Sequence, residues 1–117
     1  MGTRKYVGKI KLASVHMKKI IALAKKIQSF SSTEKVEYFK LVKSDEIDLI
    51  TEIVLNFIKC NIKYDSNSFK LLERVKSYMY LIASKKVSKS IKKKILQSLK
   101  GVNILNILLP LVINQLQ

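Results

Sequence analysis

Residues 44–58, SDEIDLITEIVLNFI, decide the fold expected of this chain. On an α-helix, at about 100° per residue, their apolar side chains form one continuous stripe. Ser44, Asp45 and Glu46 come first, where a hydroxyl can cap a helix and carboxylates interact favourably with its dipole. We therefore expect a buried helix that ends near Asn61. The stripe consists of Ile47, Ile50, Ile53, Val54, Phe57 and Ile58.

A second amphipathic helix is expected over residues 10–30. Its apolar positions recur with helical spacing and share one side, while lysines cover an arc of about 120° on the other. The apolar side consists of Ile10, Met17, Ile20, Ile21, Leu23, Ala24, Ile27 and Phe30. The basic arc consists of Lys11, Lys18, Lys19, Lys25 and Lys26.

Start signals predict three more helices. Ser31 and Glu34 have the spacing of a capping box, which predicts a short helix after them. Asp65 or Ser66 can cap a fourth helix, and Ser88 a fifth that is expected to end at Gly101. Their apolar positions are, in order, Val36, Phe39 and Val42; Phe69, Leu72, Val75, Met79 and Ile82; and Val87, Ile91, Ile95 and Leu99.

The chain changes character after Gly101. Residues 104–113 carry no charge and include Pro110, and the run is shorter than the ~20 residues of a membrane-spanning helix. We expect an all-α protein, a compact bundle of about five helices over residues 1–101 with an apolar C-terminal tail over residues 102–117. The tail is a candidate for membrane or partner contact, or it closes the core or packs between subunits. Its contact residues are Ile107, Leu108, Leu109, Leu111 and Val112.

The charge is unevenly distributed. The 117 residues include 23 Lys+Arg and 8 Asp+Glu, a net charge of +15. All the acidic residues lie within residues 34–73, so both flanks are purely basic. This asymmetry indicates an acidic partner, either nucleic acid, anionic lipid or an acidic protein. The alternative is that the lysines only keep a helical surface soluble.

Enzymatic chemistry has little support. His16 and Cys60 are the only residues of their kinds, so one chain cannot build a metal site from them, and we expect each to pack in or near the core. Carboxylate pairs such as Glu46 and Asp48 are explained by helix starts, and the three glycines form no phosphate-binding loop. We expect no enzyme, no metal and no cofactor.

The run KKVSKSIKKK, residues 85–94, carries the strongest functional signal. Lysines suit phosphate neutralisation better than base reading, and Arg4 and Arg74 are the only arginines. Binding should therefore be independent of nucleic-acid sequence and weaken steeply with salt. The candidate nucleic-acid-binding residues are Lys11, Lys18, Lys19, Lys25, Lys26, Lys85, Lys86, Lys89, Lys92, Lys93 and Lys94.

An ordered set of features from Glu46 onward supports a resemblance. It comprises the helix that continues as TEIVLNFIKCNI (51–62), LIASKKVS (81–88), the lysine-rich helix, and a Gly-containing junction into LLPL (108–111). Over residues 39–113 the chain resembles the small basic proteins encoded beside the DNA polymerase and capsid genes of Polinton/Maverick elements and adintoviruses. That family is itself similar to adenovirus core protein X, a basic virion peptide associated with DNA. The resemblance implies a virion or virus-derived context.

These observations predict a sequence-independent nucleic-acid-binding structural protein of a virion core or packaging system, with DNA favoured over RNA and an oligomer possible. It would be located in the virion or in the host nucleus or cytoplasm, since the basic N-terminus lacks the continuous apolar core of a secretory signal. One alternative is a membrane-active or capsid-anchoring protein that acts through its tail. Another is a basic ribonucleoprotein subunit.

Overall fold

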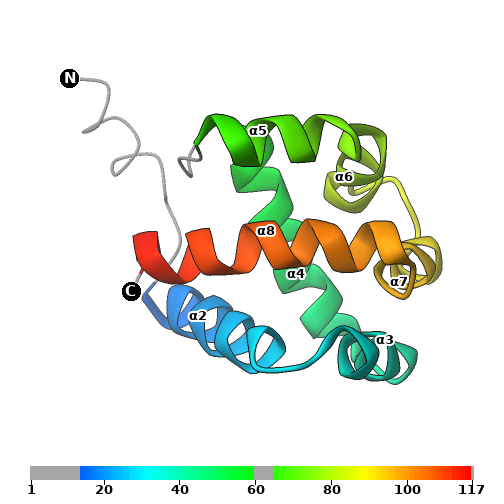
Figure 1. The fold of residues 1–117 in the computed structure, drawn as a ribbon. Coiled ribbons are helices and arrows are strands. Elements are labelled where there is room, and N and C mark those ends of the chain that lie inside the picture. The colour runs from blue at the N-terminus through cyan, green and yellow to red at the C-terminus, as the bar shows by residue number, and fades with distance from the viewer. Residues whose placement is uncertain (1–13, 60–64, 117) are drawn as a thin grey trace.

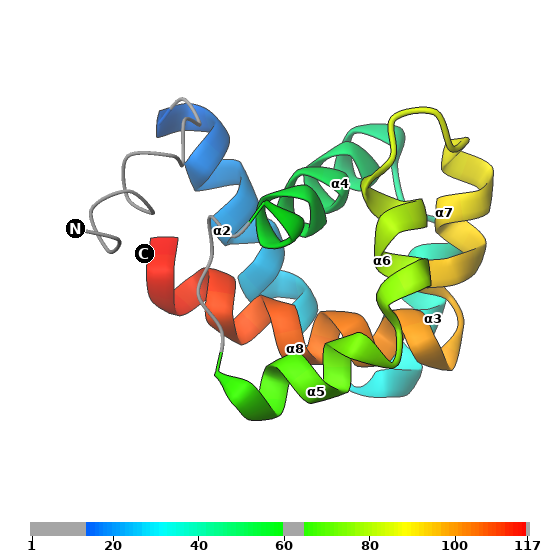
Figure 2. The same ribbon diagram turned by 90° about the horizontal axis from the view of Figure 1, so that it is seen from above.

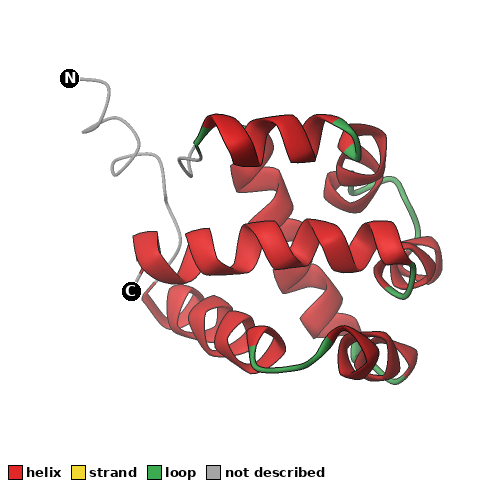
Figure 3. Cartoon of the chain, in the orientation of Figure 1, coloured by secondary structure: helices red, strands yellow, loops and turns green. Residues whose placement is uncertain are grey.

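The structure of the protein, a computed structural model, describes residues 14–59 and 65–116. These residues form seven α-helices with short connections and no strand, which confirms the all-α prediction (Figures 1 and 3). The count exceeds the expected five because one predicted helix is divided and the predicted tail is itself helical. The helices are α2 (Ser14–Gln28), α3 (Ser32–Lys40), α4 (Ser44–Ile58), α5 (Ser66–Glu73), α6 (Lys76–Ala83), α7 (Lys89–Leu96) and α8 (Leu99–Leu116).

The apolar stripe of α4 lies in the core, as predicted. Five of its six residues are buried, and Ile58 packs against the core from a partly exposed position. α4 contacts α2, α6, α7 and α8, so it packs against several helices at once. On α2, Ile20, Leu23, Ala24 and Ile27 are also buried, while Met17 and Ile21 are partly exposed. The helical periodicity of both segments therefore located the core.

The predicted helix starts are present. The backbone N–H of Ser31 donates to the Glu34 carboxylate (2.8 Å) and that of Glu34 donates to the Ser31 hydroxyl (3.2 Å), which completes the capping box of α3. Asp65 accepts from the Ser68 N–H (2.7 Å) at the start of α5. Ser88 accepts from the Ile91 N–H (3.3 Å) at the start of α7. Local hydrogen bonds alone set these boundaries.

The predicted fourth helix is two helices, α5 and α6. The backbone leaves helical geometry at Val75, whose N–H donates to the Leu72 carbonyl (3.0 Å). The turn lets α5 pack on α8 while α6 packs mainly on α4. Leu72 and Met79 are both buried as predicted, whereas Phe69 is half exposed.

The predicted tail forms α8, which crosses the centre of the molecule with α2 on one side and α5 on the other (Figures 1 and 2). The expected boundary between residues 101 and 102 falls inside this helix, whose buried residues belong to the common core. Pro110 lies within α8 and removes one backbone donor. Packing on many sides offsets this cost of about 3 kcal/mol.

The corner between α7 and α8 corrects two predictions. Gly101 does not end α7; it lies in the first turn of α8, which bends away from α7 by 84°. A Cβ at Gly101 would lie 2.1 Å from the Ile95 carbonyl oxygen, so the corner requires glycine. The expected stripe of α7 is also wrong, because Ile91 and Leu99 are 48% and 73% exposed. Steps of four residues drift around a 3.6-residue helix, and the bend turns Leu99 away from the core.

Candidate nucleic-acid interface

The outer face of α2 presents the lysines that the sequence predicted. Lys18, Lys19, Lys25 and Lys26 are exposed, opposite the buried apolar side of the helix. Because lysine carries its charge on a long flexible stem, these ammonium groups can reach phosphates without a shaped groove. The predicted Lys11 lies outside the described residues.

α7 and the connection before it form the second basic surface. Lys85, Lys86, Lys89 and Lys94 are exposed, and Lys93 is half-buried. The capping of α7 by Ser88 places Lys85 and Lys86 just ahead of the helix, beside its first turn. The charges of a short connection and a short helix are therefore concentrated at one end of the fold.

Lys92 does not belong to this surface, which corrects its assignment as a contact to nucleic acid. Its side chain is only 4% exposed, and its Nζ donates to the Thr51 hydroxyl on α4 at 2.8 Å. Burial lowers the pKa of the Lys92 ammonium; Asp48 opposes this shift and Lys89 adds to it. The sequence could not reveal this, since Lys92 occurs in the same lysine run as its exposed neighbours.

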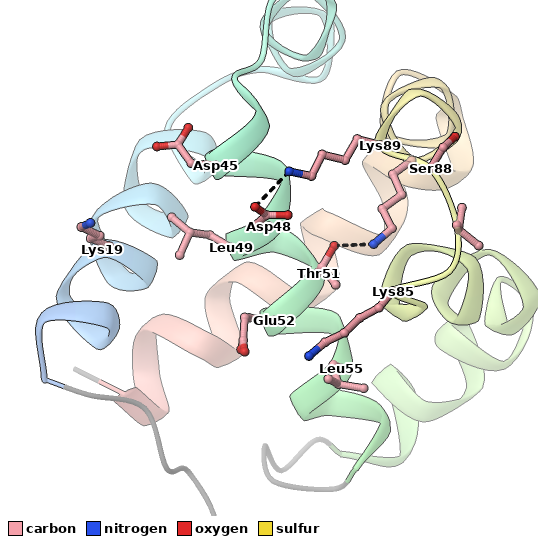
Figure 4. Close-up of a pocket in the computed structure, with 12 residues that line it drawn as sticks. Lys19, Asp45, Asp48, Leu49, Thr51, Glu52, Leu55, Lys85, Ser88 and Lys89 are labelled. Carbon is pink, nitrogen blue, oxygen red and sulfur yellow. Dashed lines mark hydrogen bonds and ion pairs between the residues drawn. The ribbon is translucent and has the colours of Figure 1, made fainter.

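An acidic face of α4 separates the two basic surfaces. Figure 4 shows Asp45, Asp48 and Glu52 along α4, with Lys19 on one side and Lys85 and Lys89 on the other. We call these three carboxylates the acidic stripe. A phosphate backbone crossing directly from α2 to α7 on this side would meet like charges.

Two of the predicted lysines are paired with acids of α4. Lys26 lies 3.6 Å from Glu46, and Lys89 lies 3.0 Å from Asp48 while also donating to the Ser44 hydroxyl. These ion pairs join segments that are far apart in the chain, so periodicity could not predict them. They leave less positive charge for an external anion.

The other predicted lysines that are accessible to solvent have no acidic partner in the described part of the chain. Within residues 14–59 and 65–116, none of them has a carboxylate oxygen within 4.0 Å of its Nζ. We call this set the unpaired lysines. It consists of Lys18, Lys19 and Lys25 on α2 and Lys85, Lys86, Lys93 and Lys94 at α7.

Glu46 interacts with residues of three different segments of the fold. Burial raises its pKa, but the nearby Tyr38 hydroxyl, the Lys43 N–H (3.2 Å) and the Lys26 ammonium outweigh burial and hold the pKa below the ordinary value of 4.5. The Tyr38 hydroxyl is buried and makes no hydrogen bond of standard geometry to the described residues. Burial, followed by the Glu46 carboxylate, raises the pKa of Tyr38. This cluster links α2, α3 and α4.

The predicted membrane or partner residues of α8 lie in or against the core. Leu108, Leu109 and Val112 are buried, while Ile107 and Leu111 are partly exposed and pack on the core. No described helix is by itself long and apolar enough to cross a membrane; the sharply bent pair α7 and α8 reaches that length and composition only when counted together. Of the two interpretations of the tail, these positions favour closure of the core.

The described residues hold no group of three histidine, cysteine or acidic side chains that could bind a metal ion. The side chain of His16 and the whole of Cys60 lie outside the described part of the structure. Their predicted places in or near the core therefore remain predictions.

A search of protein-family models, curated proteins and solved structures finds no match to this chain.

Proposed function

We propose that this protein binds nucleic acid without sequence preference, through the unpaired lysines of α2 and α7. The observation that carries the proposal is the accessibility of these seven lysines, of which only Lys93 is half-buried, together with a net charge of +15. Unpaired ammonium groups lose little by binding phosphate and release condensed counterions when they do so. Duplex DNA is the favoured partner.

The arrangement of charge also supports this function over mere solubility. The acids of α4 pair with Lys26 and Lys89, and yet the seven unpaired lysines, six of them exposed and Lys93 half-buried, have no carboxylate beside them among the described residues. A surface under selection for solubility alone would intersperse both signs. The excess is better explained by an external polyanion.

The test removes charge from one basic surface. Lys86→Gln, Lys93→Gln and Lys94→Gln are combined, and affinity for a short DNA duplex is measured from about 50 to 200 mM salt. If each lysine contacts one phosphate, the slope of log affinity against log salt should flatten by up to about 2.7. Two unrelated duplex sequences should give the same result.

A matched variant controls for net charge. Lys40→Gln, Lys43→Gln and Lys70→Gln remove three exposed charges from α3, α5 and the start of α4. This variant should keep a salt slope close to that of the unchanged protein. Equal weakening in both variants would contradict the assignment to α7, and no salt-dependent binding by the unchanged protein would contradict the function itself.

The virion context rests on the resemblance to the Polinton/Maverick and adintovirus proteins. In that context the protein would neutralise packaged DNA as a virion core or packaging component, in the particle or in the host nucleus or cytoplasm. Structured RNA that competes better than DNA of equal charge would instead support a ribonucleoprotein subunit.

The membrane-active alternative requires α8 to leave the core. Leu108, Leu109 and Val112 would have to exchange core contacts for lipid, and exposing each costs about 1.5–3 kcal/mol unless lipid replaces the core. Leakage of dye from anionic vesicles by the full chain would favour this alternative over packaging.

A further inference from the structure

A cavity of about 710 Å³ lies beside the acidic stripe, between α2, α4, α7 and the connection from α6 to α7 (Figure 4). Its volume is that of a site for a small molecule. Leu49, Leu55 and Val87 supply apolar wall, and Thr51 also lines the cavity. The proposed DNA interface does not account for this hollow.

The buried ammonium of Lys92 is the unusual feature of the cavity. A lysine Nζ has three hydrogens to donate, but the described residues offer this one a single acceptor, the Thr51 hydroxyl. The nearby Asp48 is engaged by Lys89 at 3.0 Å and forms no ion pair with Lys92. A lysine that is 4% exposed and whose ammonium has a single hydrogen-bond acceptor among the described residues favours an anionic partner.

Lys85 supplies a second positive charge to the same cavity. Its side chain extends from the α6–α7 connection towards α4 and has no carboxylate oxygen within 4.0 Å among the described residues (Figure 4). Ammonium groups form strong, charge-assisted hydrogen bonds with phosphate oxygens. The lining of the cavity also includes the acidic stripe, so four lysines face three carboxylates there, and the positive charge is in excess.

We propose that this cavity binds a small phosphate-bearing ligand, whose phosphate oxygens accept hydrogen bonds from Lys92 and Lys85. The ligand would complete the hydrogen bonding of Lys92 and pin α7 to α4. Lys85 belongs to both this site and the proposed DNA interface, whereas Lys92 belongs to this site only. The test of the DNA interface uses Lys86, Lys93 and Lys94.

The probe is inorganic phosphate, titrated into the full chain at constant ionic strength with chloride as the balancing anion. Backbone amide NMR shifts should saturate as one site, with the largest changes at Thr51 and at residues 85–92. Shifts spread evenly over all the lysine-bearing helices, or shifts that never saturate, would overturn the proposal.

Two charge-matched variants sharpen the test. Lys92→Met should weaken phosphate binding about tenfold or more, the typical loss of a buried charged hydrogen bond, whereas Lys94→Met should change it less than about threefold. Equal loss in both variants would overturn the proposal. If Lys92→Met does not fold, Lys85→Met serves in its place with the same expected contrast. Duplex DNA affinity of the unchanged protein separates the two proposals: DNA binding without saturable phosphate binding overturns this site alone.

Discussion

α7 and α8 are adjacent in the sequence but differ in what surrounds them. α7 has eight residues and presents two of its four lysines, Lys89 and Lys94, to solvent, whereas α8 has 18 residues and contacts every other described helix. The chain bends by 84° between them at a glycine that touches the backbone of α7. The comparison shows that the other helices pack around the apolar helix α8, whereas the charged helix α7 keeps lysines on the surface of the bundle.

The largest expected effect comes from removing α8. A chain that stops at Gly101 loses the buried residues Leu105, Leu108 and Leu109, and should not fold cooperatively. Far-UV circular dichroism and thermal unfolding check this against the full chain. Cooperative unfolding of the shortened chain near the original Tm would show that residues 1–101 are a separate domain and that the comparison is mistaken.

Gly101→Ala tests the corner between the two helices. At an unhindered helix position this change would stabilise by about 1 kcal/mol, but here the new Cβ meets the Ile95 carbonyl oxygen at 2.1 Å. We expect the free energy of unfolding to fall by about 1–3 kcal/mol, as for other overpacked sites. Urea unfolding measures it.

The control for the corner is Asn103→Ala, at an exposed position two residues further along α8. It should change the free energy of unfolding by less than about 0.5 kcal/mol. A stabilising Gly101→Ala would mean that α7 and α8 do not approach as described.

Within α7, Lys92→Met and Lys94→Met separate the buried charge from the exposed ones. Lys94→Met should weaken duplex DNA binding and reduce the salt slope by up to about 0.9, while Lys92→Met should leave both nearly unchanged. The reason is that the Lys92 Nζ bonds to Thr51 in the interior. Fluorescence anisotropy with a labelled duplex is the measurement, and equal losses would contradict the burial of Lys92.

The smallest effect concerns Glu46 and its contacts, which link α2, α3 and α4. Because the pKa of Glu46 lies below 4.5 in the folded state, its stabilising contribution is present above pH 4.5 and is lost as pH falls through the lowered value. Glu46→Gln should lower the free energy of unfolding by about 0.2–1 kcal/mol at neutral pH. Urea unfolding should show this difference shrinking at about pH 3, and a constant difference would contradict the ion pair with Lys26.

Short-range features were the ones that could be predicted. The α4 stripe, the capping box at Ser31 and the caps at Asp65 and Ser88 all depend on residues within four positions of one another. The corner at Gly101 was not predictable in this way, because its glycine is required by contact with Ile95 in another helix. Ser98, whose hydroxyl accepts from the Gly101 N–H at 3.2 Å, was the local signal for the start of α8.

The candidate site likewise has features that neighbouring residues predict and features that only the packing of the helices determines. The sequence by itself determined an all-α fold and two basic surfaces, since helix periodicity and charge are properties of neighbouring residues. Only the tertiary structure decided that Lys92 is buried, that Lys89 is paired with Asp48 across 41 positions, and that the apolar end is the central helix. These outcomes depend on which helix faces meet, and that is set by packing the whole chain around one core.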